Sequence, residues 1–321
     1  MRYRQHTWVL LLAGGDTAPL TFQSVGPTSA SVPRQFSSVD GTHSLLENAI
    51  ERASAIVARE RICVTVGAVH RPYWQKAQTT LLDANLIEQP RHCGTANEIL
   101  LAVLEILERD PWARLVVMPA DHYVSDELAL AGSLCLAATP STGGSDHVTL
   151  IGIEPDEADT ERGYIVPGRW LADGTRRVYR VIDKSEATLA SELAACGALW
   201  DSHIFAAPGV ALLGRLRARL PDLVDQTETA LASAAGIEAR GFALGQLYER
   251  VPSIDFSSAI IQGAESELRV IPAPSCGWTD LSTPRRVACT RHDVLSPISA
   301  SSASDATRHR RLSPVQSDGI P

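Results

Sequence analysis

The chain has 321 residues, of which 45% are hydrophobic and 21% charged, enough apolar material for one large or two small cores. This composition excludes a disordered or fibrous protein. The formal net charge of −8 opposes general binding to nucleic acid or to an anionic membrane, so we expect neither as a partner. The six cysteines include no C-x-x-C pair, which argues against a zinc or redox motif.

The N-terminus is basic, as at the start of a signal peptide. However, the apolar run that follows is brief and is not followed by a small-residue cleavage pattern. No apolar segment is long enough to span a bilayer. We therefore expect a cytoplasmic protein, and the sequence leaves open whether it forms a homodimer.

The first predicted element is a buried strand over residues 8–13, which stops at Gly14 and Gly15. Glycine permits positive φ angles and lets backbone N–H groups approach a bound anion. This turn therefore predicts a site for the phosphates of a nucleotide. Segment 16–19, which follows, lacks the further glycine and the cation from which such a loop would benefit.

Predicted strands and helices then alternate along the chain. The predicted strands are 61–67, 86–90, 115–118, 148–153, 177–182 and 268–271, and the predicted helices are 44–57, 95–107, 187–196, 210–220 and 255–262. Such alternation favours an α/β fold with a parallel sheet and helices on both faces. From residue 289 the composition becomes rich in Ser, Pro, Asp and Arg, so we expect a folded domain over 1–288 and a disordered tail over 289–321.

Candidate site residues follow the predicted strands, because open α/β sheets bind ligands at the carboxyl ends of their strands. Arg34 could neutralise phosphate charge, although a solvated surface arginine is the simpler interpretation. Thr95 and Glu98 have the spacing of a capping box at a helix N-terminus. Such a capped N-terminus could also present N–H groups to a base or phosphate.

Two acidic residues stand out as candidate metal ligands. Asp121 follows the buried strand 115–118 and is a natural ligand for Mg²⁺, although a lone aspartate there is more often a turn or cap residue. Asp280 follows Trp278 in a distant segment, and the two carboxylates could share one ion only if the fold brings them together. We expect Trp278 to be a packing anchor and His122 to be an orienting or structural histidine.

A series of short motifs occurs in order between residues 8 and 287. They are Leu-Ala-Gly-Gly15, Pro-Arg-Gln-Phe36, Gln-Pro-x-x-x-Gly-Thr-Ala96, Pro-Ala-Asp-His122, Gly-Ile-Glu-Pro155, Gly163-Tyr-Ile165, Ile182-Asp-Lys184, Trp200-Asp-Ser-His-Ile-Phe205, Ser253-Ile-Asp-Phe256 and Gly277-Trp-Thr-Asp280. Together they resemble the mannose-1-phosphate guanylyltransferases, or GDP-mannose pyrophosphorylases. The resemblance implies a Rossmann-like three-layer α/β/α nucleotidyltransferase domain of the sugar-nucleotide pyrophosphorylase type, with a mixed, mostly parallel sheet.

The resemblance also implies roles for individual residues. A catalytic group would comprise Arg34, Asp121 and Asp280, with the two aspartates holding Mg²⁺. The nucleotide, with GTP favoured, would contact Ala13, Gly14, Gly15, Gln89, Thr95 and Ala96. The sugar 1-phosphate would contact Gly163, Tyr164, Asp183, Lys184, Asp201 and Asp255. In the implied reaction, a phosphate oxygen of mannose 1-phosphate attacks the α-phosphorus of GTP in line and releases pyrophosphate, without a protein nucleophile.

The chain departs from the family pattern at positions that matter for activity. Where the family has Gly-x-Gly-Thr-Arg-Leu, this chain has Gly15-Asp-Thr-Ala-Pro-Leu20, so Pro19 replaces the loop arginine. Asp201 and His203 stand in what is usually Trp-Asn-Ser-Gly. Two functions therefore stay open: an active sugar-nucleotide synthase, or an impaired relative that binds nucleotide or a partner without turnover.

Two other enzyme classes fit the sequence less well. A Rossmann dehydrogenase would need G-x-G-x-x-G after the first strand, and the chain has no such motif there. A metal-dependent glycosyltransferase would need Asp-x-Asp after the central strand, where this chain has Asp121-His-Tyr.

Overall fold

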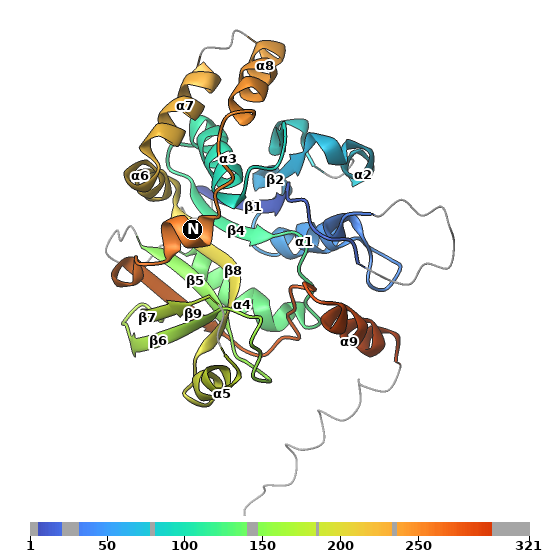
Figure 1. The fold of residues 1–321 in the computed structure, drawn as a ribbon, viewed down its shortest axis with the longest axis vertical. Helices are drawn as coiled ribbons and strands as arrows, with labels where there is room; N and C mark the ends of the chain where they lie inside the picture. The colour runs from blue at the N-terminus through green and yellow to red at the C-terminus, as the bar shows by residue number, and fades with distance from the viewer. Residues whose placement is uncertain are drawn as a thin grey trace, which may run out of the picture.

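The computed structural model describes residues 6–20, 32–77, 81–139, 147–183, 186–232 and 236–296. Among these residues, nine strands form one mixed sheet in the order β3-β2-β1-β4-β8-β5-β9-β7-β6. Helices pack on both faces of the sheet (Figure 1). The three-layer α/β/α architecture with a mixed sheet agrees with the expected fold class.

The first half of the sheet is parallel and contains β1 (Thr7–Ala13), β2 (Ile62–Gly67), β3 (Leu86–Gln89) and β4 (Arg114–Pro119). β1 and β2 are almost entirely buried, which explains their near-continuous apolar sequence. Because these strands run the same way, their carboxyl ends lie along one edge of the sheet. The glycine turn after β1 and Asp121 after β4 are therefore neighbours in space.

The second half of the sheet contains β5 (Val148–Ile153), β6 (Tyr164–Trp170), β7 (Arg176–Ile182), β8 (Leu199–Pro208) and β9 (Leu268–Ala273). β8 runs antiparallel to both of its long neighbours, β4 and β5, while β5 and β9 are parallel. β6 and β7 pair in antiparallel fashion, and β6 also contacts β8. The sheet is thus less parallel than expected, because β8 enters it between β4 and β5 in the opposite direction.

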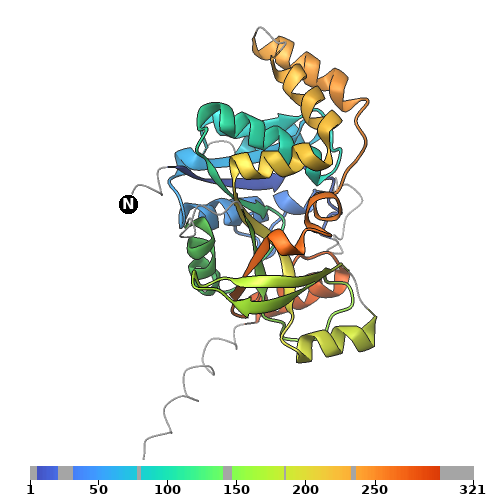
Figure 2. The ribbon, with the colours of Figure 1, turned by 90° about the vertical axis from the view of Figure 1, so that its left-hand side faces the viewer.

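Two layers of helices cover the sheet, as Figure 2 shows from the side. One face carries α3 (Thr95–Arg109), α6 (Gly209–Arg219), α7 (Pro221–Ala232) and α8 (Ile237–Tyr248), and the other carries α1 (Leu45–Ser54), α2 (Arg71–Ala77), α4 (Glu127–Ala138) and α5 (Ala187–Ala195). The strands supply both cores by alternation: Leu10 packs on the α3 side, and Val9 and Leu11 pack on the α1 side. The sequence did not predict α2, α4, α7, α8, β6 or β8.

Two sequence-based boundaries differ from the structure. Helix α9 (Pro284–Leu295) crosses the expected domain end at residue 288, because Val287 is buried against Leu20, Leu45 and Leu281. Residues 297–321 of the expected tail lie outside the described residues. The expected helix 255–262 is a single π-helical turn, Ser257–Ile261. Within the described ranges, no helix has both the length and the apolar character needed to cross a membrane.

Candidate functional site

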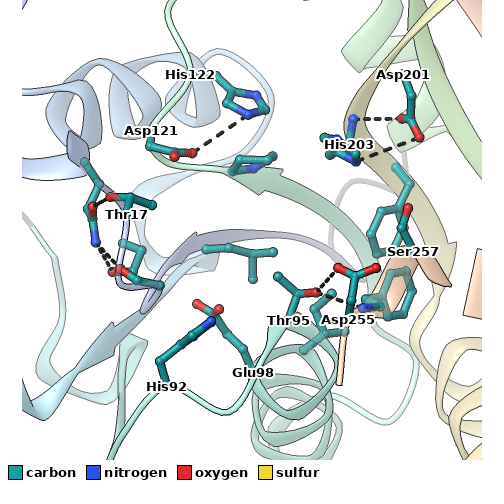
Figure 3. A pocket seen from close by; sticks show the side chains of 18 of the residues that line it. Thr17, His92, Thr95, Glu98, Asp121, His122, Asp201, His203, Asp255 and Ser257 are labelled. Carbon is teal, nitrogen blue, oxygen red and sulfur yellow. Dashed lines mark hydrogen bonds and ion pairs between the residues drawn. The ribbon is translucent and has the colours of Figure 1, made fainter. Parts of the chain in front are cut away.

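A cavity of about 370 Å³ opens at the carboxyl ends of β1 and β4. Figure 3 shows side chains from helix α3, from the ends of β1 and β4, from β8 and from the segment before the π-helical turn around it. Of the expected site residues, the cavity is lined by Ala13, Gly15, Thr95, Asp121, Asp201 and Asp255. The fold therefore brings together residues that the sequence holds far apart.

The glycine turn is held in place by Gln35, which sequence reasoning did not single out. The Gln35 amide donates to the carbonyl oxygens of Ala13 and Gly15, both at 2.9 Å, and it accepts a hydrogen bond from the Thr17 hydroxyl. Gln35 is buried, so these bonds replace those it would make with water. Its place in the motif Pro-Arg-Gln-Phe36 was the only sequence signal for this role.

Gly14 packs so tightly that no side chain fits there. A Cβ at Gly14 would collide with the Gln89 amide, which lies buried behind the turn instead of lining the cavity. The Gly14 N–H donates to Glu98 at 2.9 Å. The glycine is therefore required by the close approach of β3 and α3, and its N–H is already paired within the protein.

The capping box expected at Thr95 and Glu98 is wrong. Helix α3 is preceded by Gly94 at φ 82°, where a Cβ would collide with the Ile254 backbone. The Thr95 hydroxyl accepts from the Phe256 N–H at 2.8 Å and donates to Asp255 at 3.2 Å. Because segment 254–256 packs over the start of the helix, it supplies the polar partners that a local cap would have supplied.

The backbone N–H of Ala96, an expected nucleotide contact at the start of α3, is already hydrogen-bonded within the protein. Its N–H donates to the Ile254 carbonyl at 3.0 Å, and the residue is fully buried. Helix α3 nonetheless directs its N-terminal end, and the positive end of its dipole, at the cavity through Thr95 and Glu98.

Glu98 is a buried acid in the cavity wall. It accepts hydrogen bonds from the Gly14 N–H and from the Thr65 hydroxyl. Burial raises the pKa of Glu98 to about 7, although both hydrogen bonds oppose the rise because they favour the carboxylate. Part of the Glu98 population is therefore uncharged near neutral pH.

Asp121 follows β4, lines the cavity and forms an ion pair with Arg34. Its Oδ2 lies 3.4 Å from Arg34 Nη1, and burial raises its pKa while the Arg34 charge opposes the rise. The neighbouring His122 accepts a hydrogen bond from the Trp278 indole at 3.3 Å, and its Nε2 lies 3.8 Å from Asp121 Oδ1. Burial lowers the pKa of His122 and so favours the neutral ring, and its expected role as an orienting or structural histidine stays a prediction. Trp278 is buried, as expected of a packing anchor.

Asp280 lies near Asp121, but its carboxylate is paired elsewhere. The Asp280 carbonyl accepts from Arg34 Nη1 at 2.9 Å, so one guanidinium links the two aspartates. Both Asp280 carboxylate oxygens accept from Arg286 Nη1, at 2.8 and 3.0 Å. Burial favours a higher pKa for Asp280, but the Ser282 N–H and nearby cationic groups such as Arg286 hold it well below its usual range.

These contacts decide how a divalent cation would fit. Among the described residues, no three or more His, Cys, Asp or Glu side chains are grouped as a metal site. Mg²⁺ needs only one or two carboxylates when substrate phosphates complete its shell. Asp121 meets this requirement from the cavity wall, whereas Asp280 does not line the cavity and would have to exchange Arg286 for the ion.

Three further expected ligands, Gly163, Tyr164 and Asp183, do not line the cavity. Gly163 accepts from the Asp201 N–H at 2.9 Å, and the buried Tyr164 uses its hydroxyl to bind the Asp159 backbone. Asp183 is exposed, next to Gly163. Lys184 lies outside the described residues.

Apolar and imidazole groups complete the wall and were also missed. Phe205 of β8 stacks on Phe256, with ring centroids 4.9 Å apart, and both rings line the cavity. His92 and His203 line it from opposite sides, beside the glycine turn and on β8. No periodicity in the sequence marks these residues, because each reaches the cavity from a loop or an irregular part of a strand.

Comparison with known proteins bears on the family and the fold. No protein-family model matches the chain. The mannose-1-phosphate guanylyltransferase RfbM of Salmonella typhimurium is 27% identical over 288 residues, which cover 85% of this chain and 56% of that protein. The mannose-1-phosphate guanylyltransferase of Salmonella muenchen is 27% identical over 264 residues, covering 78% of this chain and 53% of that protein.

A solved structure agrees with these relatives. A protein described as a mannose-1-phosphate geranyltransferase from Thermus thermophilus superposes with a TM-score of 0.73 at 25% identity, covering 86% of this chain and 76% of that one. The chain spans about half the length of the curated relatives it matches. The predicted resemblance to mannose-1-phosphate guanylyltransferases and the nucleotidyltransferase fold are thus confirmed.

Proposed function

We propose that this protein transfers a nucleoside monophosphate from a nucleoside triphosphate to a sugar 1-phosphate. The proposed substrates are GTP and mannose 1-phosphate, and the products are GDP-mannose and pyrophosphate. The observation that carries the proposal is a single cavity that brings Gly15 of the glycine turn, Asp121 after β4, and Asp201 and Asp255 to one place. The names of the curated relatives supply the substrates.

The cavity is suited to a ligand that carries its own cation. Five acidic residues line it among those described: Asp16, Glu98, Asp121, Asp201 and Asp255. The described lining includes no lysine or arginine. Polyphosphate would be repelled from such a wall unless a metal ion accompanied it, so we propose that the nucleotide binds with Mg²⁺ at Asp121. The bound ion would neutralise the charge that develops on the phosphates.

The proposed reaction needs orientation more than acid–base chemistry. An oxygen of the sugar phosphate forms a bond to the α-phosphorus, and the bond to the β-phosphate oxygen breaks with its electron pair leaving on pyrophosphate. The attacking phosphate is already ionised, so no general base is required. In this scheme Arg34 holds the Asp121 carboxylate, the α3 N-terminus faces the nucleotide phosphates, and Asp201 and Asp255 accept hydrogen bonds from the sugar hydroxyls.

One observation favours a second candidate function, nucleotide binding without turnover. Pro19 occupies the position of the family's loop arginine, and the guanidinium of Arg34 is paired with Asp121 and with the Asp280 carbonyl. Loss of a preorganised charge-stabilising donor costs about 10²–10³ in rate. A chain impaired to this degree would still bind nucleotide.

Pyrophosphate release separates the two functions. The purified chain is assayed with four nucleoside triphosphates and with mannose or glucose 1-phosphate, with Mg²⁺ or with chelator. We expect release with GTP and mannose 1-phosphate that requires the metal. The rate of pyrophosphate release should fall at least about 100-fold in an Asp121→Asn variant. The matched Asp222→Asn change, on the exposed surface of α7, should leave this rate unchanged. Nucleotide binding without release in any pair would reject the enzyme and support the second candidate.

A further inference from the structure

Strand β8 leaves the sheet ladder where it passes the cavity. On the β5 side, Leu150 pairs with Phe205 and Gly152 pairs with Asp201, so residues 202–204 stand opposite Ile151 alone. The Ser202 hydroxyl holds this bulge by donating to the Ile151 carbonyl at 2.6 Å and accepting from the Ile204 N–H at 3.2 Å. A bulge of this kind re-aims a side chain, and here the residue at its centre is His203.

The backbone of His203 has a conformation that suits the glycine found at this position in the family pattern better than a histidine. Its φ is 56°, in the left-handed region that favours glycine, and among the described non-glycine residues only Leu281 shares a positive φ. Leu281 is buried in a core cluster, whereas the His203 side chain is 52% exposed and lines the cavity. The fold therefore places an exposed histidine side chain in the cavity at a position where its backbone is disfavoured, and the ring is a candidate for contact with a ligand there.

The conformation is enforced by Asp201. This buried carboxylate accepts the His203 N–H at 2.9 Å, and its other oxygen lies 3.8 Å from His203 Nδ1. Figure 3 shows the two side chains interacting on β8, across the pocket from Asp121 and His122. An acceptor near Nδ1 favours a proton on that nitrogen, and an imidazolium would present a second proton at Nε2.

His203 also stands out among the charges of the cavity. Of the histidines in the described lining, His122 is buried and accepts from the Trp278 indole, and His92 lies with its Nδ1 buried. His203 is the half-exposed one, and it lines the same cavity as Asp121. It is therefore the group best placed in this acidic wall to donate to an anionic ligand near Asp121.

We propose that His203 is a substrate-binding residue that donates a hydrogen bond from the Nε2–H of its imidazolium to the phosphate of the sugar 1-phosphate. The inference rests on the proposed function and assigns the attacking phosphate to the space between His203 and Asp121. Asp201 fixes the backbone of His203 by accepting its N–H, and the other Asp201 carboxylate oxygen lies beside the ring. The histidine thus brings a donor into a cavity whose described lining has no lysine or arginine.

Stability and activity should move in opposite directions when His203 is replaced. His203→Gly relieves the positive φ, so its melting temperature should equal or exceed that of the unchanged protein. Loss of a charge-assisted hydrogen bond should lower kcat/KM for mannose 1-phosphate about 10- to 100-fold. His203→Asn, which tolerates the left-handed region but offers only a shorter and uncharged donor, should also lower kcat/KM. Added imidazole should partly restore the glycine variant.

The control is His43→Gly, which removes an exposed histidine outside the cavity and should leave kcat/KM unchanged. If His203→Gly retains kcat/KM within about twofold, the inference is overturned whatever its stability. Should the unchanged protein bind mannose 1-phosphate without turnover, the proposed reaction fails. The inference is then judged by calorimetry, which should give an about 10- to 100-fold weaker Kd for His203→Gly. If the unchanged protein does not bind mannose 1-phosphate, both the proposed reaction and the role of His203 are rejected.

Discussion

Replacement of Glu98 by glutamine should change how the stability of the fold depends on pH. The carboxyl has an ordinary pKa of 4.5, and burial raises its pKa to about 7 in the folded protein. The folded state therefore holds a proton that the unfolded state releases, and stability falls as pH rises from 4.5 through 7. The difference between these two pKa values corresponds to a loss of about 3 kcal/mol in the free energy of unfolding.

The Glu98→Gln variant should not lose stability in this way as the pH rises, because glutamine carries no titrating proton. Both hydrogen bonds to Glu98, from Gly14 and from Thr65, end on Oε1, so the oxygen of a glutamine side chain can accept them in the same way. Glu98→Gln should match the unchanged protein at about pH 4.5 and exceed it by up to about 3 kcal/mol above about pH 8.

Urea denaturation at half-unit steps from about pH 4.5 to about pH 8.5 measures this difference. Glu51→Gln, at an exposed position of α1, serves as the matched control and should follow the unchanged protein. If Glu98→Gln and the unchanged protein lose stability in parallel across this range, then Glu98 is not the buried acid that the structure describes. If Glu98→Gln were more stable than the unchanged protein by the same amount at every pH, the reasoning would also be contradicted. Such a constant difference would come from packing and not from proton release.

Three further substitutions test the contacts around the site. Gly94→Ala should destabilise the fold by about 3 kcal/mol, because it combines a φ of 82° with a collision against Ile254; a melting temperature equal to that of the unchanged protein would contradict this. Arg286→Gln should cost about 3 kcal/mol in urea denaturation by leaving the Asp280 carboxylate without its guanidinium partner, and an unchanged midpoint would show that the pair contributes nothing. Ser44→Ala removes a complete capping box from α1 and should cost about 1 kcal/mol, with pyrophosphate release unaffected.

Several elements were predictable because their signals are local. The buried run over 8–13 and the two glycines after it predicted β1 and its turn, and the run over 115–118 predicted β4. Apolar residues repeat with the period of the element that buries them, so the sequence alone carries this information. Helix α4 was missed because apolar residues surround nearly its whole circumference, and β8 was missed because its bulge interrupts the alternation.

The candidate site was predictable only in part. Asp121, Asp201 and Asp255 could be named from their motifs, and all three line the cavity. The roles of Glu98 and Asp280 could not be assigned from their neighbours in the chain. Glu98 has the spacing of a helix cap but instead accepts the Gly14 N–H, 84 positions away. Asp280 has the setting of a metal ligand but is paired with Arg286, on helix α9.

By itself, the sequence determined an α/β chain with a glycine turn after its first strand and acidic residues after later ones. Local periodicity and the order of the motifs suffice for that. Only the tertiary structure decided which of these acids face the cavity, which are neutralised by arginine, and that His203 is held in a strained conformation beside them. Those properties depend on burial and on contacts between distant segments, which exist only once the β4, β8 and α3 elements have packed together.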